Sequence, residues 1–245
     1  MLLRAIYFLK VRKNRFQELN NISDDTASNS VFTNKRIILK NYDKKIKKHP
    51  RAKYFLGIGL DLSGLKSSWI IQALKAIPEI NKYKKKLRLL IIGPRNEGEI
   101  FNFRGHGFSK KNIEAIDLMS YSPLIKLGDM HELKYPDDTF DIVYAGWVIA
   151  YSENKIKAAN ELCRVAKNNK FIAIGWSVSS STNDEIIEKR GYMIGSKERV
   201  QCVDDILQLF SERKVEVIFS SPRNWNRINN KNAVDQIILI LQVKK

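Results

Sequence analysis

The chain has 245 residues, of which 44% are hydrophobic and 28% charged, enough to bury a core as one large domain or as one domain with an extension. Its two cysteines, Cys163 and Cys202, exclude a disulfide framework, and its three histidines exclude a histidine-rich metal centre, so we expect a cytoplasmic protein without a metal. The net charge of +17 is uneven, because residues 1–86 hold 20 Lys and Arg against 6 Asp and Glu.

This charge asymmetry bears on the partners of the chain. The surplus of 14 positive charges in residues 1–86 predicts an anionic partner, such as a phosphorylated glycan, a nucleotide-sugar, a nucleic acid or lipid head groups. The longest apolar runs, such as residues 237–241, are far shorter than the roughly 20 residues of a membrane-spanning helix. Any contact with a membrane is therefore expected to be peripheral.

The first third of the chain, residues 1–84, is predicted to be a basic, mainly helical N-terminal extension. Apolar residues recur at helical spacing over residues 2–19, and residues 20–34 are rich in Ser, Thr, Asn and Asp, which is typical of a loop. A second helix is predicted over residues 67–77, with Pro78 near its end, and a basic linker at 82–86 follows. We expect this extension to form a lid over the substrate site.

From residue 87 onward, strands and helices alternate. Strands are predicted at 87–92, 113–118, 125–128, 140–146, 170–176, 214–220 and 233–243, and helices at 98–106, 154–167 and about 203–213. The alternation predicts an α/β fold with a parallel, right-handed, doubly wound sheet. The polar loop at 221–232 is too short for a crossover helix, so the last two strands are predicted to pair antiparallel, as a hairpin at the sheet edge.

Acidic residues stand at successive strand ends. Asp117 ends the second predicted strand, Asp129 follows the next one, and a turn at residues 93–99, with Gly93 and Gly98, follows the first strand. In a parallel sheet these positions meet at one end of the sheet, next to helix N-termini and backbone N–H groups. Their order and spacing predict a nucleoside-bearing cofactor lying across this end of the sheet.

Two segments resemble the signatures of a known family. The first, residues 128–143, contains Gly128-Asp129, Leu133, Pro136 and Thr139-Phe140-Asp141; the second, residues 160–171, contains Glu161, Arg164-Val165 and Asn168-Asn169, the last pair standing where the family has Pro-Gly. Both resemble class I S-adenosylmethionine-dependent methyltransferases, with a methyltransferase type 11-like domain over residues 85–245. The resemblance implies a Rossmann-like, seven-stranded, mostly parallel sheet with an antiparallel C-terminal hairpin strand, and S-adenosyl-L-methionine as the cofactor.

The same resemblance implies which strand-end residues bind this cofactor. Asp117 is expected to accept hydrogen bonds from the ribose hydroxyls, with Leu118 beside it, and Asp129 to accept from the adenine amino group. Met130 is expected to donate its backbone N–H and to pack on the ring, and His131 to lie beside the adenine.

The turn after the first strand departs from the family pattern. Ile91 stands where the family has an acidic residue, and only the first glycine and a displaced last one are kept. A turn of this kind still has to bring backbone N–H groups to the cofactor. The predicted cofactor contacts in the turn are Gly93, Pro94, Arg95, Glu97 and Gly98. Arg95 can bind the methionine carboxylate, and Glu97 or Glu99 its ammonium group.

The residues after the fourth strand are expected to face the methyl-transfer cleft. Gly146 allows close backbone approach, and Trp147 can form one wall of the cleft. Tyr151 can orient or deprotonate a hydroxyl group, with core packing as the alternative. Trp147 and Tyr151 are the candidates for a catalytic role, and no general base is identified. Trp176 and Ser177 are expected at the mouth of the cleft.

The function that the resemblance implies is transfer of a methyl group to an oxygen or nitrogen atom of a small-molecule or sugar acceptor, which the charge asymmetry predicts to be anionic. Two alternatives stay open. The basic first third favours RNA methylation, although no recognised RNA-binding motif is present. The altered glycine turn favours a binding protein that keeps the fold without catalysis.

Overall fold

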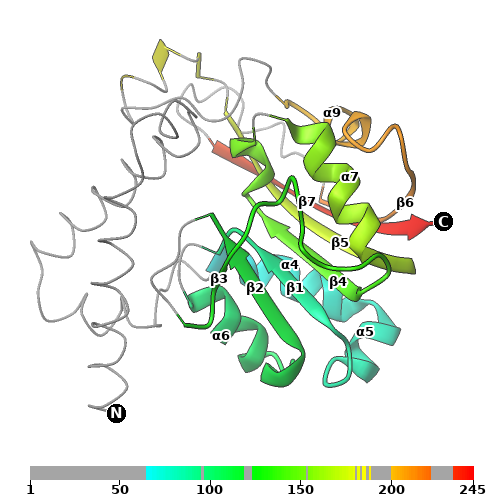
Figure 1. Cartoon of the computed structure of the whole chain (residues 1–245). Coiled ribbons are helices and arrows are strands. Elements are labelled where there is room, and N and C mark those ends of the chain that lie inside the picture. The colour runs from blue at the N-terminus through cyan, green and yellow to red at the C-terminus, as the bar shows by residue number, and fades with distance from the viewer. Residues whose placement is uncertain are drawn as a thin grey trace, which may run out of the picture.

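The computed structural model describes residues 65–94, 97–118, 123–152, 154–179, 181–182, 184–185, 188, 200–221 and 234–245. Seven strands of this part of the chain form one sheet (Figure 1). In chain order they are β1 (Leu89–Ile92), β2 (Ile113–Asp117), β3 (Lys126–Leu127), β4 (Phe140–Gly146), β5 (Ala166–Ser179), β6 (Lys214–Ser220) and β7 (Val234–Lys244). Across the sheet the order is β3-β2-β1-β4-β5-β7-β6.

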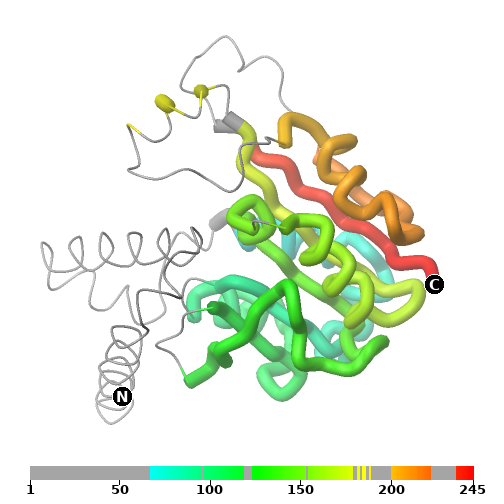
Figure 2. The backbone as a smooth tube through the Cα atoms, turned by 45° about the horizontal axis from the view of Figure 1, so that its top comes forward, coloured from blue at the N-terminus to red at the C-terminus, as the bar shows by residue number. Residues whose placement is uncertain are grey.

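The sheet is parallel except at β7. Strands β1 to β5 pair in parallel, whereas β7 pairs antiparallel with both β5 and β6. Figure 2 shows β7, in red, between β5 and the orange segment that contains α9 (Val203–Gln208) and β6. The predicted α/β fold, mostly parallel with an antiparallel C-terminal strand, is confirmed. The outer strand of the pair is β6, because β7 inserts next to β5.

Alternate residues of each central strand enter two separate cores. Leu89 and Ile91 of β1 pack in one hydrophobic cluster, and Leu90 and Ile92 pack in the other. All four residues are buried, because helices cover both faces of a doubly wound sheet. This is why β1 is a continuous apolar run without polar alternation.

The helices divide between the two faces. On one face lie α4 (Leu65–Ala76), α5 (Pro78–Tyr83) and α6 (Gly98–Gly105), and on the other lie α7 (Lys155–Val165) and α9 (Figure 1). Ile70, Ile71 and Leu74 of α4 are fully buried against the sheet. Asn154 caps α7 by accepting a hydrogen bond from the backbone N–H of Lys157 (2.9 Å). Two short 3₁₀ turns complete the described elements, η2 (Lys110–Asn112) and η3 (Ile149–Tyr151).

The helices before β1 belong to the packed core. Helix α4 and the stretch that forms α5 lie within the predicted extension, but Leu74 and Ile80 are fully buried in the same cluster as Leu89 and Ile91 of β1. Helix α5 was not predicted as a separate element, since Pro78 begins it rather than ending the helix before it. Residues 1–64, the larger part of the predicted extension, lie outside the described residues. Among the described residues, no helix has the length and hydropathy needed to cross a membrane.

Candidate functional site

The loops that follow β1, β2, β3 and β4 lie at one end of the sheet, because these strands are parallel neighbours. Backbone hydrogen bonds connect them: Gly93 N–H donates to the carbonyl of Ile116 (2.8 Å), and Gly128 N–H donates to the carbonyl of Asp117 (3.0 Å). The described residues predicted to bind the cofactor belong to these loops, to the last residues of the strands or, for Gly98, to the start of α6. Arg95 lies outside the described residues.

The turn after β1 is built around Gly93. Its φ of +69° is a conformation that side chains disfavour, and a Cβ there would lie 2.2 Å from a methyl group of Val148. Pro94 is buried, Glu97 is 9% exposed, and Gly98 is the first residue of α6. Ile91, at the family's acidic position, is fully buried in the core. The turn therefore approaches the loop after β4 closely but offers no strand carboxylate.

Asp117 and Asp129 differ in burial. Asp117 is the last residue of β2 and is 3% exposed, with Leu118 half-buried after it. The Asp129 side chain is 48% exposed. Met130 between Asp129 and His131 is 5% exposed and packs in the core on the α7 face. Its side chain is thus committed to the core, which leaves its backbone as the group available to a ligand.

His131 joins two of the loops. Its Nδ1 lies 2.6 Å from Oδ1 of Asp129, and its Nε2 lies 2.6 Å from Oγ of Ser152, which follows η3. The backbone N–H of His131 also donates to Oδ1 of Asp129 (2.8 Å). Ser152 was not singled out from the sequence. Being 21 residues from His131, it gives no local signal of this contact.

Trp147 is held between three strands. Its φ is +56°, its backbone N–H donates to the carbonyl of Gly175 (2.9 Å), and its Nε1–H donates to Oε1 of Gln236 in β7 (2.5 Å). A Cβ on Gly175 would lie 2.7 Å from the indole ring, so the ring packs directly on the backbone of β5. Ser177 also donates to Oε1 of Gln236 (2.9 Å). A non-glycine residue with positive φ stores strain, and such residues gather at functional sites.

The other aromatic candidates lie differently. Tyr151, the last residue of η3, is half-buried and packs against the core on the α7 face, which agrees with the alternative of core packing. Trp176 was expected at the cleft mouth, but it is 4% exposed and belongs to that same core. Side chains alternate along β5, and Trp176 therefore shares a face with Ile172 and Ile174.

Tyr144 was not predicted as a site residue. Its hydroxyl is buried beside Gly146, where a Cβ would lie 2.1 Å from that oxygen, and it has no hydrogen-bond partner among the described residues. Burial, together with the negative charge of Glu99, raises the pKa of the Tyr144 hydroxyl well above its ordinary value. The hydroxyl therefore stays protonated.

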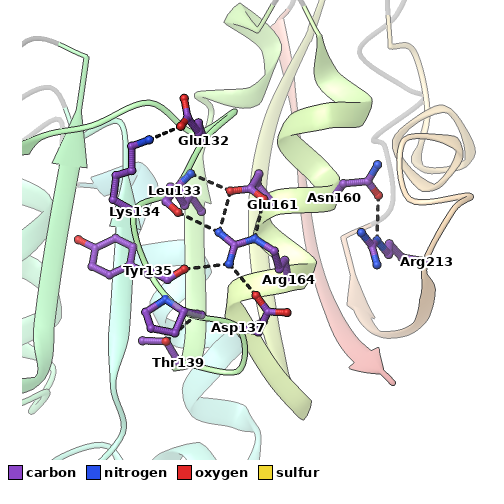
Figure 3. A network of polar contacts seen from close by, with 12 residues as sticks. Glu132, Leu133, Lys134, Tyr135, Asp137, Thr139, Asn160, Glu161, Arg164 and Arg213 are labelled. Carbon is purple, nitrogen blue, oxygen red and sulfur yellow. Dashed lines mark hydrogen bonds and ion pairs between the residues drawn. The ribbon is translucent and has the colours of Figure 1, made fainter.

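The second sequence signature forms a structural network around Arg164 (Figure 3). The guanidinium donates to both carboxylate oxygens of Glu161 (2.6 and 2.9 Å), to Asp137 (2.7 Å) and to the carbonyls of Leu133 and Tyr135 (both 2.8 Å). These five hydrogen bonds use all five N–H groups of an arginine. The network attaches the loop between β3 and β4 to α7.

The comparisons with known proteins agree with this architecture. Residues 104–174 match the family model described as "Methyltransferase domain". The match begins within α6, so it does not include β1 or the turn at Gly93. A search of curated proteins found no match.

Solved structures share the fold at low sequence identity. A putative sarcosine dimethylglycine methyltransferase from Galdieria sulphuraria is 12% identical, with a TM-score of 0.55 over 75% of this chain and 87% of that one. The N-methyltransferase NodS from Bradyrhizobium japonicum WM9, solved with S-adenosyl-L-homocysteine, is 11% identical, with a TM-score of 0.53 over 89% of this chain and all of that one. At these identities the likeness shows the fold, and the predicted fold class is confirmed.

Proposed function

We propose that the chain is a class I, S-adenosylmethionine-dependent methyltransferase, which methylates an oxygen or nitrogen atom of an anionic small-molecule or sugar acceptor. The observation that carries the proposal is the pair of carboxylates Asp117 and Asp129 at neighbouring strand ends. The cofactor supplies a methyl group on a positively charged sulfur, which an acceptor lone pair can displace.

The residues present fit an adenosine-bearing cofactor. Among the described residues no group donates a hydrogen bond to Oδ2 of Asp129, whose side chain is 48% exposed, so this oxygen can accept from an exocyclic amino group. Asp117, the last residue of β2, would accept hydrogen bonds from the ribose hydroxyls, since a carboxylate at this strand end suits a nucleoside cofactor. The turn at Gly93 and the N-terminus of α6 would face the methionine end.

The work left to the protein is positioning. Methyl transfer from a sulfonium requires the acceptor atom to be held in line and water to be excluded, and a dedicated base is not essential. Trp147 supports this role, because Gln236 and Gly175 fix its indole at the end of β4. The surplus of 14 positive charges in residues 1–86 supports an anionic acceptor.

Two measurements on the full chain test the proposal. Calorimetric titration with S-adenosylhomocysteine should give saturable binding and a raised melting temperature. Incubation with methyl-labelled S-adenosylmethionine and a small-molecule extract should then transfer label to an anionic metabolite. Absence of both binding heat and thermal shift would remove the cofactor site and favour the non-catalytic alternative.

RNA methylation is the second candidate, favoured by the same basic segment. Filter binding with total RNA should then show retention that falls steeply with salt, and the label should appear in RNA rather than in metabolites. Binding of S-adenosylhomocysteine without label in either fraction would contradict both acceptor classes.

A further inference from the structure

Asp129, His131 and Ser152 form a continuous chain of side chains from the interior to the surface. Ser152 is fully buried, the His131 side chain is 18% exposed, and the Asp129 side chain is 48% exposed. Both links measure 2.6 Å, between Oγ of Ser152 and Nε2 of His131 and between Nδ1 of His131 and Oδ1 of Asp129. The chain connects the loop after β3 to the end of η3.

The chemistry of the three groups assigns the direction of each hydrogen bond. An ionised carboxylate only accepts, so Nδ1 of His131 carries the proton that lies against Asp129. In the neutral ring Nε2 then accepts from the hydroxyl of Ser152. The order of groups is that of a hydrolytic triad, but Ser152 is fully buried and cannot reach an external substrate. The arrangement is therefore suited to holding a carboxylate in place.

The two oxygens of Asp129 are used unequally. Oδ1 accepts both donors that His131 offers, its backbone N–H (2.8 Å) and its Nδ1–H (2.6 Å). Oδ2 accepts from no donor in the part of the chain that the structure describes. A carboxylate that is fixed through one oxygen presents the other in a defined direction, which favours recognition of a single N–H group.

We propose that His131 is a positioning residue, which fixes Asp129 so that Oδ2 selects a purine with a 6-amino group over one with a 6-oxo group. This inference rests on the proposed function, since it assumes that the adenine of the cofactor lies at Asp129. An amino group donates to Oδ2, whereas a 6-oxo group presents a second acceptor to it. A hydrogen bond to a charged group gives a preference of about 10- to 100-fold.

Two amide variants of His131 distinguish the contact that Nδ1 makes with Asp129 from the contact that Nε2 makes with Ser152. The side-chain amide of His131→Asn can take the place of Nδ1 and keep the donor to Asp129, whereas that of His131→Gln reaches the place of Nε2 and keeps only the contact with Ser152. Calorimetry with S-adenosylhomocysteine and with its 6-oxo analogue, S-inosylhomocysteine, gives the preference for each protein. The unaltered chain and His131→Asn should prefer the adenosyl compound by about 10-fold or more, and His131→Gln by less than about 3-fold.

The ratio of the affinities for S-adenosylhomocysteine and S-inosylhomocysteine shows whether His131 positions Asp129 or only supports the fold. Equal weakening of both compounds in His131→Gln, with the ratio kept, would mean a purely structural role and would overturn the inference. If the His131 variants do not unfold cooperatively, Ser152→Ala is used instead. It keeps the ring and its bond to Asp129, so the preference should stay at about 10-fold or more, as in His131→Asn, and loss of the preference there would overturn the inference. His106→Asn, a substitution at the end of α6, is the control and should leave both affinities unchanged. Failure of the unaltered chain to bind either compound would overturn the proposed function itself.

Discussion

The loop between β3 and β4 has polar networks at both of its ends, and they differ in how completely their groups are used. At its start, Oδ1 of Asp129 takes two hydrogen bonds from His131 and Oδ2 takes none from the described residues. At its far end, all five N–H groups of Arg164 are used by groups of the same chain. A saturated network contributes stability, whereas a fixed group with spare capacity is suited to bind a ligand.

Residues of the two sequence signatures therefore have different roles at the two ends of this loop. Asp129 and Arg164 both belong to the signatures that resemble the family, yet of these two only Asp129 keeps an atom that no described residue uses, its Oδ2. The Arg164 side chain is 26% exposed and bridges two backbone carbonyls and two carboxylates (Figure 3). Substitutions at the start of the loop should therefore change ligand binding, and substitutions at its far end should change stability.

The largest expected effect is on ligand binding, at the strand end next to the start of the loop. Asp117→Ala should weaken binding of S-adenosylhomocysteine by at least about 100-fold, because two hydroxyl groups lose a charged acceptor. Calorimetric titration measures this affinity. Asp137→Ala removes a carboxylate from the far end of the loop and serves as the matched control, with an affinity within about 2-fold of the unaltered chain. Similar affinities for the two variants would contradict the division of roles.

The second effect is on stability. Arg164→Met should lower the free energy of unfolding by about 3 kcal/mol, because Glu161 and two carbonyls lose their donors while partly shielded from water. Urea unfolding followed by circular dichroism measures it. Arg164→Lys keeps the charge but cannot make five hydrogen bonds. Its free energy of unfolding should therefore lie between those of the unaltered chain and Arg164→Met. A loss of ligand affinity in the folded variant, without a loss of stability, would count against the structural role.

The stability that Arg164 provides should depend on pH. Hydrogen bonding from Arg164 lowers the pKa of the Glu161 carboxyl, so this carboxylate contributes stability above its ordinary pKa of about 4.3. The contribution is lost as the pH falls through the lower pKa of the folded state. The difference in unfolding free energy between the unaltered chain and Arg164→Met should therefore shrink between pH 6 and pH 3. A difference that stays constant over this range would argue against the ion pair as its source.

The smallest expected effect concerns the buried hydroxyl of Tyr144, which lies beside Gly146 in β4. Tyr144→Phe removes an oxygen without a hydrogen-bond partner among the described residues, so the unfolding free energy should stay within about 1 kcal/mol or rise. Thermal unfolding measures it. A fall of more than about 2 kcal/mol would show that the hydroxyl has a partner in the remaining part of the chain.

The strands could be predicted because their patterns are local. Strands β4 and β6 have the predicted bounds, 140–146 and 214–220, since each is a short run of alternating or continuous apolar residues between polar turns. Asn169 is a further local case. It has a φ of +57° near the start of β5, at the position where the resembled family has Gly, and Asn tolerates this conformation better than most residues.

The site could be predicted only in part, because its contacts are not local. The carboxylates were predicted from their positions at strand ends, but Ser152 lies 21 residues from His131 and Gln236 lies 89 residues from Trp147. No spacing rule connects such pairs. The burial of Trp176, in contrast, could have been predicted from a local pattern. Trp176 is two and four residues from Ile174 and Ile172, and alternate residues of a strand lie on the same face.

The position of β7 has a kinetic consequence. During synthesis β6 emerges before β7, the strand that separates it from β5, and its residues Val217, Ile218 and Phe219 are about 40% exposed even in the folded sheet. The nascent chain must therefore carry an unpaired apolar strand until residues 234–244 leave the ribosome, a state prone to aggregation. Because Gln236 also fixes Trp147, the contacts of this indole form only after β7 has been synthesised. Chaperone dependence and acquisition of the proposed activity should therefore share this late step.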